Sequence, residues 1–183
     1  MKRIILLAAT VIIISGSLFS QSSAEYVNWY SFEEAVEKVS ENPKKIFIDI
    51  YTDWCGWCRR MDEETFSNPD VADYLNEHFY PVKLNAETTD TIAFQGHEFV
   101  NEGNGSRSAH QLPIALLQGQ MSYPSVAYMD ENLQLLTVVP GFTTPENIEP
   151  LLRFFGEDHY KSISWEEFSN SFSGTFNTEN GER

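Results

Sequence analysis

The sequence has little cysteine, little positive charge and few long apolar runs. Two of its 183 residues are cysteine, and 12 Lys and Arg residues stand against 27 Asp and Glu, which gives a formal net charge of −15 at pH 7. Phosphate backbones and anionic headgroups repel such a chain, so nucleic acid and acidic membrane surfaces are not expected as partners. Hydrophobic residues at 42% and aromatic residues at 14% predict a packed core, and the length suits one domain.

The longest apolar run lies at the N-terminus. Lys2 and Arg3 precede apolar residues 4–14, and Ser22-Ser23-Ala24 supplies the small residues that a signal peptidase accepts. The run is short for a membrane-spanning helix, which is the alternative interpretation. We expect a signal peptide over residues 1–24, cleaved near the alanine, and a periplasmic or secreted protein with no stable membrane insertion afterwards. Disulfides persist in such an environment.

Hydrophobic periodicity after the signal peptide predicts alternating strands and helices. Capping-box spacing at Ser31 and Glu34 marks one helix start, and Asn68-Pro69 marks another. The expected elements are a strand near 26–29, a helix from 31 to 42, a strand at 46–51, helices after 55 and after 68, a strand at 80–84, a small hairpin within 91–100, a helix within 109–118, a hairpin of strands at 125–129 and 133–139, and helices from 144 to 156 and from 164 to 172. Residues 173–183 are expected to form a flexible tail.

The two cysteines, Cys55 and Cys58, lie two residues apart in the stretch "DWCGWC". A zinc site normally needs four ligands, and none of the four histidines has ligand-pair spacing. A structural disulfide would close a loop too short to stabilise the fold much. A redox pair fits better, because a helix that begins at Cys55 lowers the pKa of that thiol through its free backbone N–H groups and its dipole. Cys55 would then be the exposed sulfur that attacks, and Cys58, one turn deeper, the recessed sulfur that resolves a mixed disulfide.

Asp49 is the second unusual residue, because it lies between Ile48 and Ile50 in a strand that the sequence predicts to be buried on both faces. A buried carboxylate is costly unless it is paired, hydrogen-bonded or protonated. One interpretation is an edge position with the side chain in water. The functional interpretation is a buried carboxyl with a raised pKa, which exchanges a proton with Cys58 when that thiol attacks.

The strand, turn and helix in "IFIDIYTDWCGWCRR" resemble the active-site region of the thioredoxin superfamily, with Asp49 and Trp54 at positions that match its buried carboxylate and its tryptophan. The resemblance covers roughly residues 26–156. It implies an α/β protein with a thioredoxin-like fold, in which helices flank a central mixed sheet. Residues 25–172 would form this domain. The segment of about 88–122 has no counterpart in thioredoxin and would be a hairpin-plus-helix insertion beside the active site, as in exported relatives.

The resemblance also assigns site residues. It implies a cis peptide bond at Tyr123-Pro124, beside the redox pair, and places Gly141 at the border of the substrate groove. Thioredoxin itself has Gly-Pro between its cysteines, whereas this chain has Gly-Trp and lacks the histidine of strongly oxidising members. The absence of that histidine favours a pair that reduces its partners. The residues expected to line the substrate groove are Trp54, Gly56, Trp57, Tyr123, Pro124 and Gly141.

We therefore expect an exported thiol:disulfide oxidoreductase whose catalytic residues are Cys55, Cys58 and Asp49, with no cofactor besides the redox pair. Its partners would be protein thiols and disulfides and an external electron donor or acceptor. Two alternatives stay open: a non-catalytic peptide-binding or chaperone module, and a dedicated electron relay such as one for cytochrome maturation. Arg59 and Arg60 either add positive charge near the helix start or are solvated surface residues. Of the histidines, His110 either approaches the site or is a capping or solvated residue.

Overall fold

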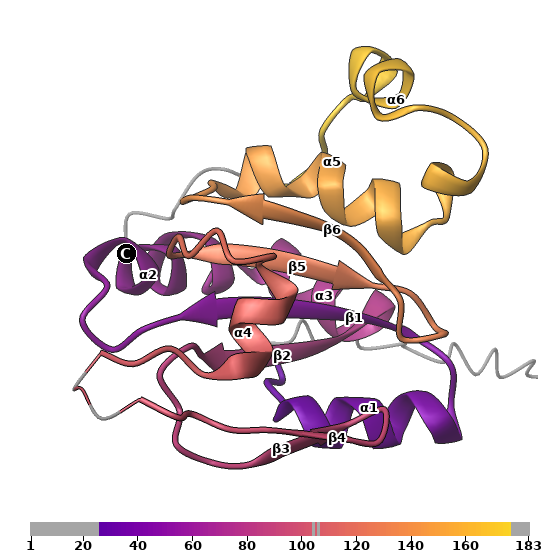
Figure 1. The fold of residues 1–183 in the computed structure, drawn as a ribbon. Helices are drawn as coiled ribbons and strands as arrows, with labels where there is room; N and C mark the ends of the chain where they lie inside the picture. Colours follow the sequence, from indigo (N-terminus) through magenta and orange to yellow (C-terminus); the bar gives the residue numbers. More distant parts are fainter. Residues whose placement is uncertain (1–25, 104, 106, 177–183) are drawn as a thin grey trace, which may run out of the picture.

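The computed structural model describes residues 26–103, 105 and 107–176. The predicted signal peptide therefore lies outside the described residues. At the centre is a four-stranded sheet in the order β2-β1-β5-β6 (Figure 1). Strand β1 runs parallel to β2 and antiparallel to β5, which in turn pairs antiparallel with β6, so the predicted mixed sheet is confirmed. The strands are β1 (Lys45–Tyr51), β2 (Phe79–Asn85), β5 (Ser125–Met129) and β6 (Leu135–Pro140).

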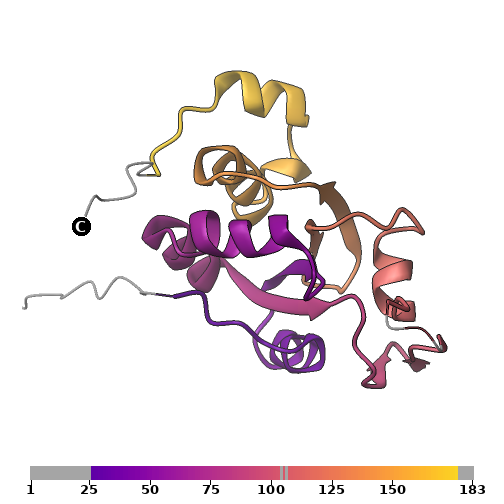
Figure 2. The same cartoon turned by 90° about the vertical axis from the view of Figure 1, so that its left-hand side faces the viewer.

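Helices cover both faces of this sheet, as the alternation of side chains along β1 requires. Phe47 points into a core shared with α2, α3 and α5, whereas Ile46 and Ile48 point into a second core shared with α1 and α4. Figure 2 shows from the side how helices lie on either face of the sheet. The helices are α1 (Phe32–Glu41), α2 (Gly56–Met61), α3 (Pro69–His78), α4 (Gln111–Leu116) and α5 (Pro145–Gly156). No helix among the described residues is both long and apolar enough to cross a membrane.

Helix α1 begins where the sequence predicts, because the capping box is formed in both directions. The Ser31 hydroxyl accepts a hydrogen bond from the Glu34 N–H, and the Glu34 carboxylate accepts one from the Ser31 N–H. The expected strand near residues 26–29 is not formed. The chain makes a single bridge between Tyr30 and Val82 of β2 and then enters the helix at once.

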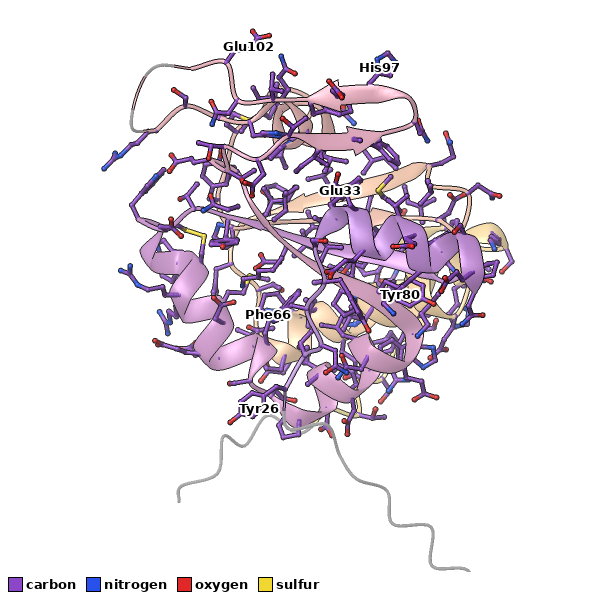
Figure 3. All side chains as sticks on the ribbon, turned by 90° about the horizontal axis from the view of Figure 1, so that it is seen from below. Tyr26, Glu33, Phe66, Tyr80, His97 and Glu102 are labelled. Carbon is purple, nitrogen blue, oxygen red and sulfur yellow. A yellow bond between two sulfur atoms is a disulfide. The ribbon has the colours of Figure 1, made fainter. Side chains whose placement is uncertain are left out.

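The segment between β2 and β5 folds as a hairpin and a short helix. Strands β3 (Ile92–Phe94) and β4 (His97–Phe99) pair antiparallel, and α4 follows them. Glu33 of α1 accepts a hydrogen bond from the Ala93 N–H, which ties the hairpin to the helix beneath it (Figure 3). His110 is the N-cap of α4, so of the alternatives for this histidine the structure has the capping one.

The C-terminal part packs against the outer edge of the sheet. A 3₁₀ turn (His159–Lys161) leads to α6 (Trp165–Ser171), and an apolar hollow of about 710 Å³ lies between β6, α5 and α6. Of the expected flexible tail, the structure describes residues 173–176. There the buried Glu149 carboxylate of α5 accepts hydrogen bonds from the backbone N–H groups of Thr175 and Phe176.

Candidate redox site

The redox pair lies at the start of α2, in the turn that follows β1. Figure 1 shows this strand and helix, and Figure 3 shows the disulfide in yellow. Cys55 and Cys58 form a disulfide, with their Cα atoms 5.3 Å apart. Cys55 is the N-cap of α2, and its Sγ accepts a hydrogen bond from the Cys58 N–H at 3.0 Å. The helix therefore begins directly after Cys55, and a thiolate there would meet a backbone donor and the positive end of the helix.

The difference in exposure between the two cysteines is smaller than we expected. Cys55 is 5% exposed and Cys58 2%, so both are buried in the disulfide form. The reason is local: Cys55 Sγ turns towards the N–H groups of the helix start rather than towards solvent. The predicted asymmetry of an exposed and a recessed sulfur is therefore wrong for this form. What distinguishes Cys55 is its N-cap position.

Asp49 lies in the middle of β1 and its side chain is 1% exposed, so the edge-strand interpretation is wrong. Its Oδ2 atom is 2.5 Å from Nζ of Lys83, and its buried Oδ1 has no hydrogen-bond partner among the described residues. Burial and, to a smaller extent, the nearby Asp62 raise the pKa of Asp49 to about 6, even though the charge and hydrogen bond of Lys83 lower it. A carboxyl with this pKa can gain or lose a proton near neutral pH.

Lys83 and Asp62 are site residues that the sequence analysis missed. Lys83 Nζ contacts both the Asp49 and the Asp62 carboxylates. Burial alone would lower the pKa of Lys83, but the two carboxylates outweigh this effect and the pKa is raised. The register gives the reason for the contact: Asp49 and Lys83 are partners in the parallel pairing of β1 and β2. A charged residue in each of two apolar strands was the available signal.

The Asp49–Lys83–Asp62 group opens towards solvent on one side. The exposed fraction of the side chain rises from 1% for Asp49 to 20% for Lys83 and 44% for Asp62. A surface cleft of about 540 Å³, lined by Trp29 and Phe66 among others, reaches Lys83 and Asp62. The group is therefore in contact with solvent through Lys83 and Asp62.

Aromatic rings surround the disulfide. Trp54 and Trp57, the residues before each cysteine, are 47% and 56% exposed. Trp54 contacts Tyr123 edge-on, with ring centroids 6.1 Å apart, and Trp57 contacts Phe142 at 5.6 Å. The sequence analysis did not include Phe142 in the groove, because only the folded chain brings the loop after β6 next to α2.

The loop before β5 has the expected geometry. The Tyr123-Pro124 peptide bond is cis, as the resemblance implied. Gly141, with φ of 97°, donates its N–H to the Pro124 carbonyl at 2.8 Å, which joins the loop after β6 to the cis-proline loop. This positive φ favours glycine at the position. Gly56 is exposed in the first turn of α2.

The described residues contain no group of three or more His, Cys, Asp and Glu side chains arranged to hold a metal ion. The groups that the structure brings together at the site are two sulfurs, a buried carboxyl, a lysine and an aromatic rim. The fold and this arrangement define a thioredoxin-fold protein with a thiol–disulfide redox pair.

The comparison with protein families agrees. A family model described as "Thioredox_DsbH: Protein of unknown function, DUF255" matches residues 12–142, so the chain belongs to this family. An uncharacterized protein of Archaeoglobus fulgidus is 35% identical over 88 residues, which cover 47% of this chain and 68% of that protein. Spermatogenesis-associated protein 20 of Rattus norvegicus is 37% identical over 62 residues, or 33% of this chain and 8% of the relative's length. The thiol:disulfide interchange protein DsbD of Pseudoalteromonas atlantica is 32% identical over 71 residues, 38% of this chain and 12% of that protein.

Solved structures show the same fold. A structure described as DsbH oxidoreductase superposes with a TM-score of 0.55 at 17% sequence identity, over 78% of this chain and 95% of that chain. A thioredoxin from Thermus thermophilus gives a TM-score of 0.54 at 14% identity, over 81% of this chain and 99% of that chain. At such identities the likeness concerns the fold alone.

Proposed function

We propose that this protein is an exported thiol:disulfide oxidoreductase that reduces disulfides in other proteins through a Cys55/Cys58 dithiol–disulfide cycle. The observation that carries the proposal is a disulfide at the N-terminus of α2, in the same chain segment as a buried carboxyl whose pKa is raised to about 6. Relatives named as thiol:disulfide interchange proteins support the same class. Export is supported by the signal-like residues 1–24.

The cycle conserves atoms and electrons. The Cys55 thiolate attacks one sulfur of the partner disulfide, a Cys55–partner bond forms, and the second partner sulfur leaves as a thiolate that takes a proton from water. Cys58 then gives its proton to Asp49 and attacks Cys55 Sγ, so that the Cys55–Cys58 bond forms and the first partner sulfur leaves as a thiolate. Two electrons pass to the partner, and an external dithiol donor restores the reduced pair. The scheme needs no cofactor.

The reducing direction is supported by the residues between the cysteines. Gly56 and Trp57 provide no cation that would stabilise the Cys55 thiolate and thereby the reduced form. We expect a reduction potential nearer to that of thioredoxin, about −270 mV, than to that of DsbA, about −120 mV. Equilibration with glutathione buffers measures it, and a value near −120 mV would reverse the proposed direction.

A disulfide reduction assay on the reduced protein tests the activity. Cys55→Ala should abolish turnover, because no thiolate remains to attack the partner. Cys58→Ala should accumulate mixed disulfides, because the resolving sulfur is absent. Equal reduction by the wild type and Cys55→Ala would instead favour a peptide-binding module that holds a static disulfide.

The segment of residues 88–122 favours a second candidate, a dedicated electron relay. Arg107 from this segment contacts Trp54 beside the redox pair, which adds to the partner-facing surface a group absent from thioredoxin. Partners trapped by Cys58→Ala in cells separate the two: a single trapped protein supports the relay, and many trapped proteins support a general reductase.

A further inference from the structure

Arginine is concentrated at the redox pair of this acidic chain. The structure describes four arginines, and Arg59 and Arg60 lie in α2 directly after Cys58. Arg107 comes from the insertion, some fifty positions along the chain, and yet contacts Trp54 before Cys55. Only Arg153, in α5, lies elsewhere and pairs with Glu149. The guanidinium groups therefore gather where a partner must dock.

Each of the two exposed tryptophans of the motif is in contact with the guanidinium group of an arginine. The guanidinium carbon of Arg107 is 4.8 Å from the centroid of the Trp54 ring. That of Arg60 is 5.3 Å from the Trp57 ring. Contact with an aromatic face holds a guanidinium in place and leaves its N–H edges directed outward. Trp and Arg are also the residue types that dominate binding energy at protein interfaces.

Two of these arginines have no acidic partner among the described residues. Arg60 pairs with Glu64 at 2.7 Å. Within the described part of the chain, neither Arg59 nor Arg107 contacts a carboxylate, and the hydrogen bond of Arg59 goes to the backbone carbonyl of Asp53 at 3.4 Å. Their donor groups are therefore available to a ligand.

The carboxylates of this region are engaged with other groups. Glu87 accepts a hydrogen bond from the Trp54 indole N–H at 2.8 Å, and Asp53 accepts one from the Asn85 amide at 3.3 Å. These neutral donors hold the two acidic side chains. Arg59 and Arg107 are thus exposed beside an apolar rim, and no carboxylate among the described residues pairs with them.

We propose that Arg59 and Arg107 form a carboxylate-binding collar, and that preferred partners carry Asp or Glu side chains next to the disulfide that Cys55 attacks. The inference rests on the proposed function and adds a substrate class to it. Guanidinium binds carboxylate through parallel hydrogen bonds, which gives specificity as well as energy. The net charge of −15 repels acidic partners at long range, but about 0.15 M salt screens charges beyond roughly 8 Å. At contact distance the collar decides which residues lie beside the cysteine.

Three synthetic peptides test the collar, each closed by one disulfide and flanked by Glu, Gln or Lys at the same two positions. Two quantities are measured at 0.15 M salt: the rate constant for reduction by the reduced protein, and the affinity for the Cys55→Ser/Cys58→Ser variant, which binds without redox chemistry. The wild type should prefer the Glu peptide to the Gln peptide by about threefold to tenfold. In Arg59→Gln/Arg107→Gln this ratio should fall to about one. Lys38→Gln/Lys44→Gln, which removes the same number of positive charges in α1 and just before β1, is the control and should keep the wild-type ratio.

The outcomes separate this inference from the proposed function. Reduction without preference for Glu, or a preference that persists in the double arginine variant, overturns the collar and leaves the reductase in place. Glu-dependent binding by the redox-dead variant, without reduction of any peptide by the wild type, supports the collar and overturns the reductase.

Discussion

At the scale of single residues, Asp49 links folding to the proposed chemistry. Burial raises its pKa from 3.8 to about 6, so the folded protein binds this proton more tightly than the unfolded chain does. The contribution of Asp49 to the free energy of unfolding therefore falls as pH rises from about 4 to about 6, and is constant above that range. A residue that destabilises the fold at neutral pH is understandable if its proton is needed in the reaction.

Asp49→Asn should remove this loss of stability at neutral pH. At pH 7.5 the oxidised variant should be more stable than the wild type by roughly 1 to 3 kcal/mol, because the uncharged amide costs less to bury. Lys83 keeps a partner in Asp62. The difference should disappear near pH 4, where both side chains are uncharged. Urea unfolding at several pH values measures it.

Glu37→Gln, a similar change at an exposed position of α1, serves as the control and should show no such pH dependence. Asp49→Asn should also slow release of the partner from the mixed disulfide, since Asn cannot accept the Cys58 proton. A stability difference that stays constant from pH 4 to 7.5 would contradict the raised pKa of Asp49.

Substitutions of Asp62 and of Lys83 should shift the pKa of Asp49 in opposite directions. Asp62→Asn removes a negative charge that raises the pKa of Asp49 and leaves Lys83 to Asp49 alone, so the Asp49 pKa should fall. Lys83→Met removes the charge that lowers it, and the Asp49 pKa should rise by about one unit or more. Carboxyl titration by NMR in the oxidised form reads out both shifts. Shifts of the same sign in both variants would show that the Asp49–Lys83–Asp62 group does not act as a unit.

At the scale of elements, one buried histidine holds the insertion together. His110 is fully buried, its Nδ1 accepts the Leu112 N–H at 3.2 Å, and its Nε2 lies 3.0 Å from the Asp90 carbonyl. With the proton on Nε2, one ring accepts a hydrogen bond at the start of α4 and donates one to Asp90, just before β3.

His110→Ala should therefore open the insertion locally, at a cost of about 1 to 3 kcal/mol, because a backbone N–H and a carbonyl lose their partners. Hydrogen exchange should speed up at Leu112, whereas amides of β1 should stay protected. His110→Asn keeps a cap acceptor and should lose less protection at Leu112. Equal loss of protection in β1 would mean that α4 does not open as a separate unit.

Elements with local causes were predictable from sequence, and those with distant causes were not. The capping box at Ser31 predicts α1, and Asn68-Pro69 predicts α3, because each start depends on residues within one turn. The π-helical turn of Asp62–Phe66, which follows α2 directly, was not predicted. Its first residue contacts Lys83 of β2, which lies 21 positions further along the chain, so no local pattern reveals it.

At the scale of the whole molecule, the sheet assembles a site that the sequence contains only in pieces. The cysteines, Asp49 and the cis proline were predictable because each belongs to one short motif with known chemistry. Lys83 was not, since its contact depends on the register of β1 against β2. Arg107 was not, because a polar loop gives no indication of the ring on which it folds back. Short sequence motifs therefore predict the reacting groups. The groups around them come from distant segments and become visible only in the folded chain.

The chain end provides the last prediction, because the Glu149 carboxylate joins α5 to residues 175–176. Burial raises the pKa of Glu149, but hydrogen bonds from Phe176 and Thr175 and the pairing with Arg153 outweigh this effect and lower it. A lowered pKa stabilises the fold above the ordinary value of 4.5, and the gain disappears as pH falls through the folded-state pKa.

Deletion of residues 174–183 should therefore reduce the free energy of unfolding at pH 7 by roughly 1 to 3 kcal/mol, because Glu149 loses backbone donors and keeps only Arg153. Deletion of residues 177–183 is the matched control: it retains Thr175 and Phe176 and should change stability by less than about 0.5 kcal/mol. The difference between the two truncations should shrink at low pH, where Glu149 is protonated. Urea unfolding at pH 7 and in acid measures both, and equal effects of the two deletions would mean that this carboxylate does not stabilise the chain end.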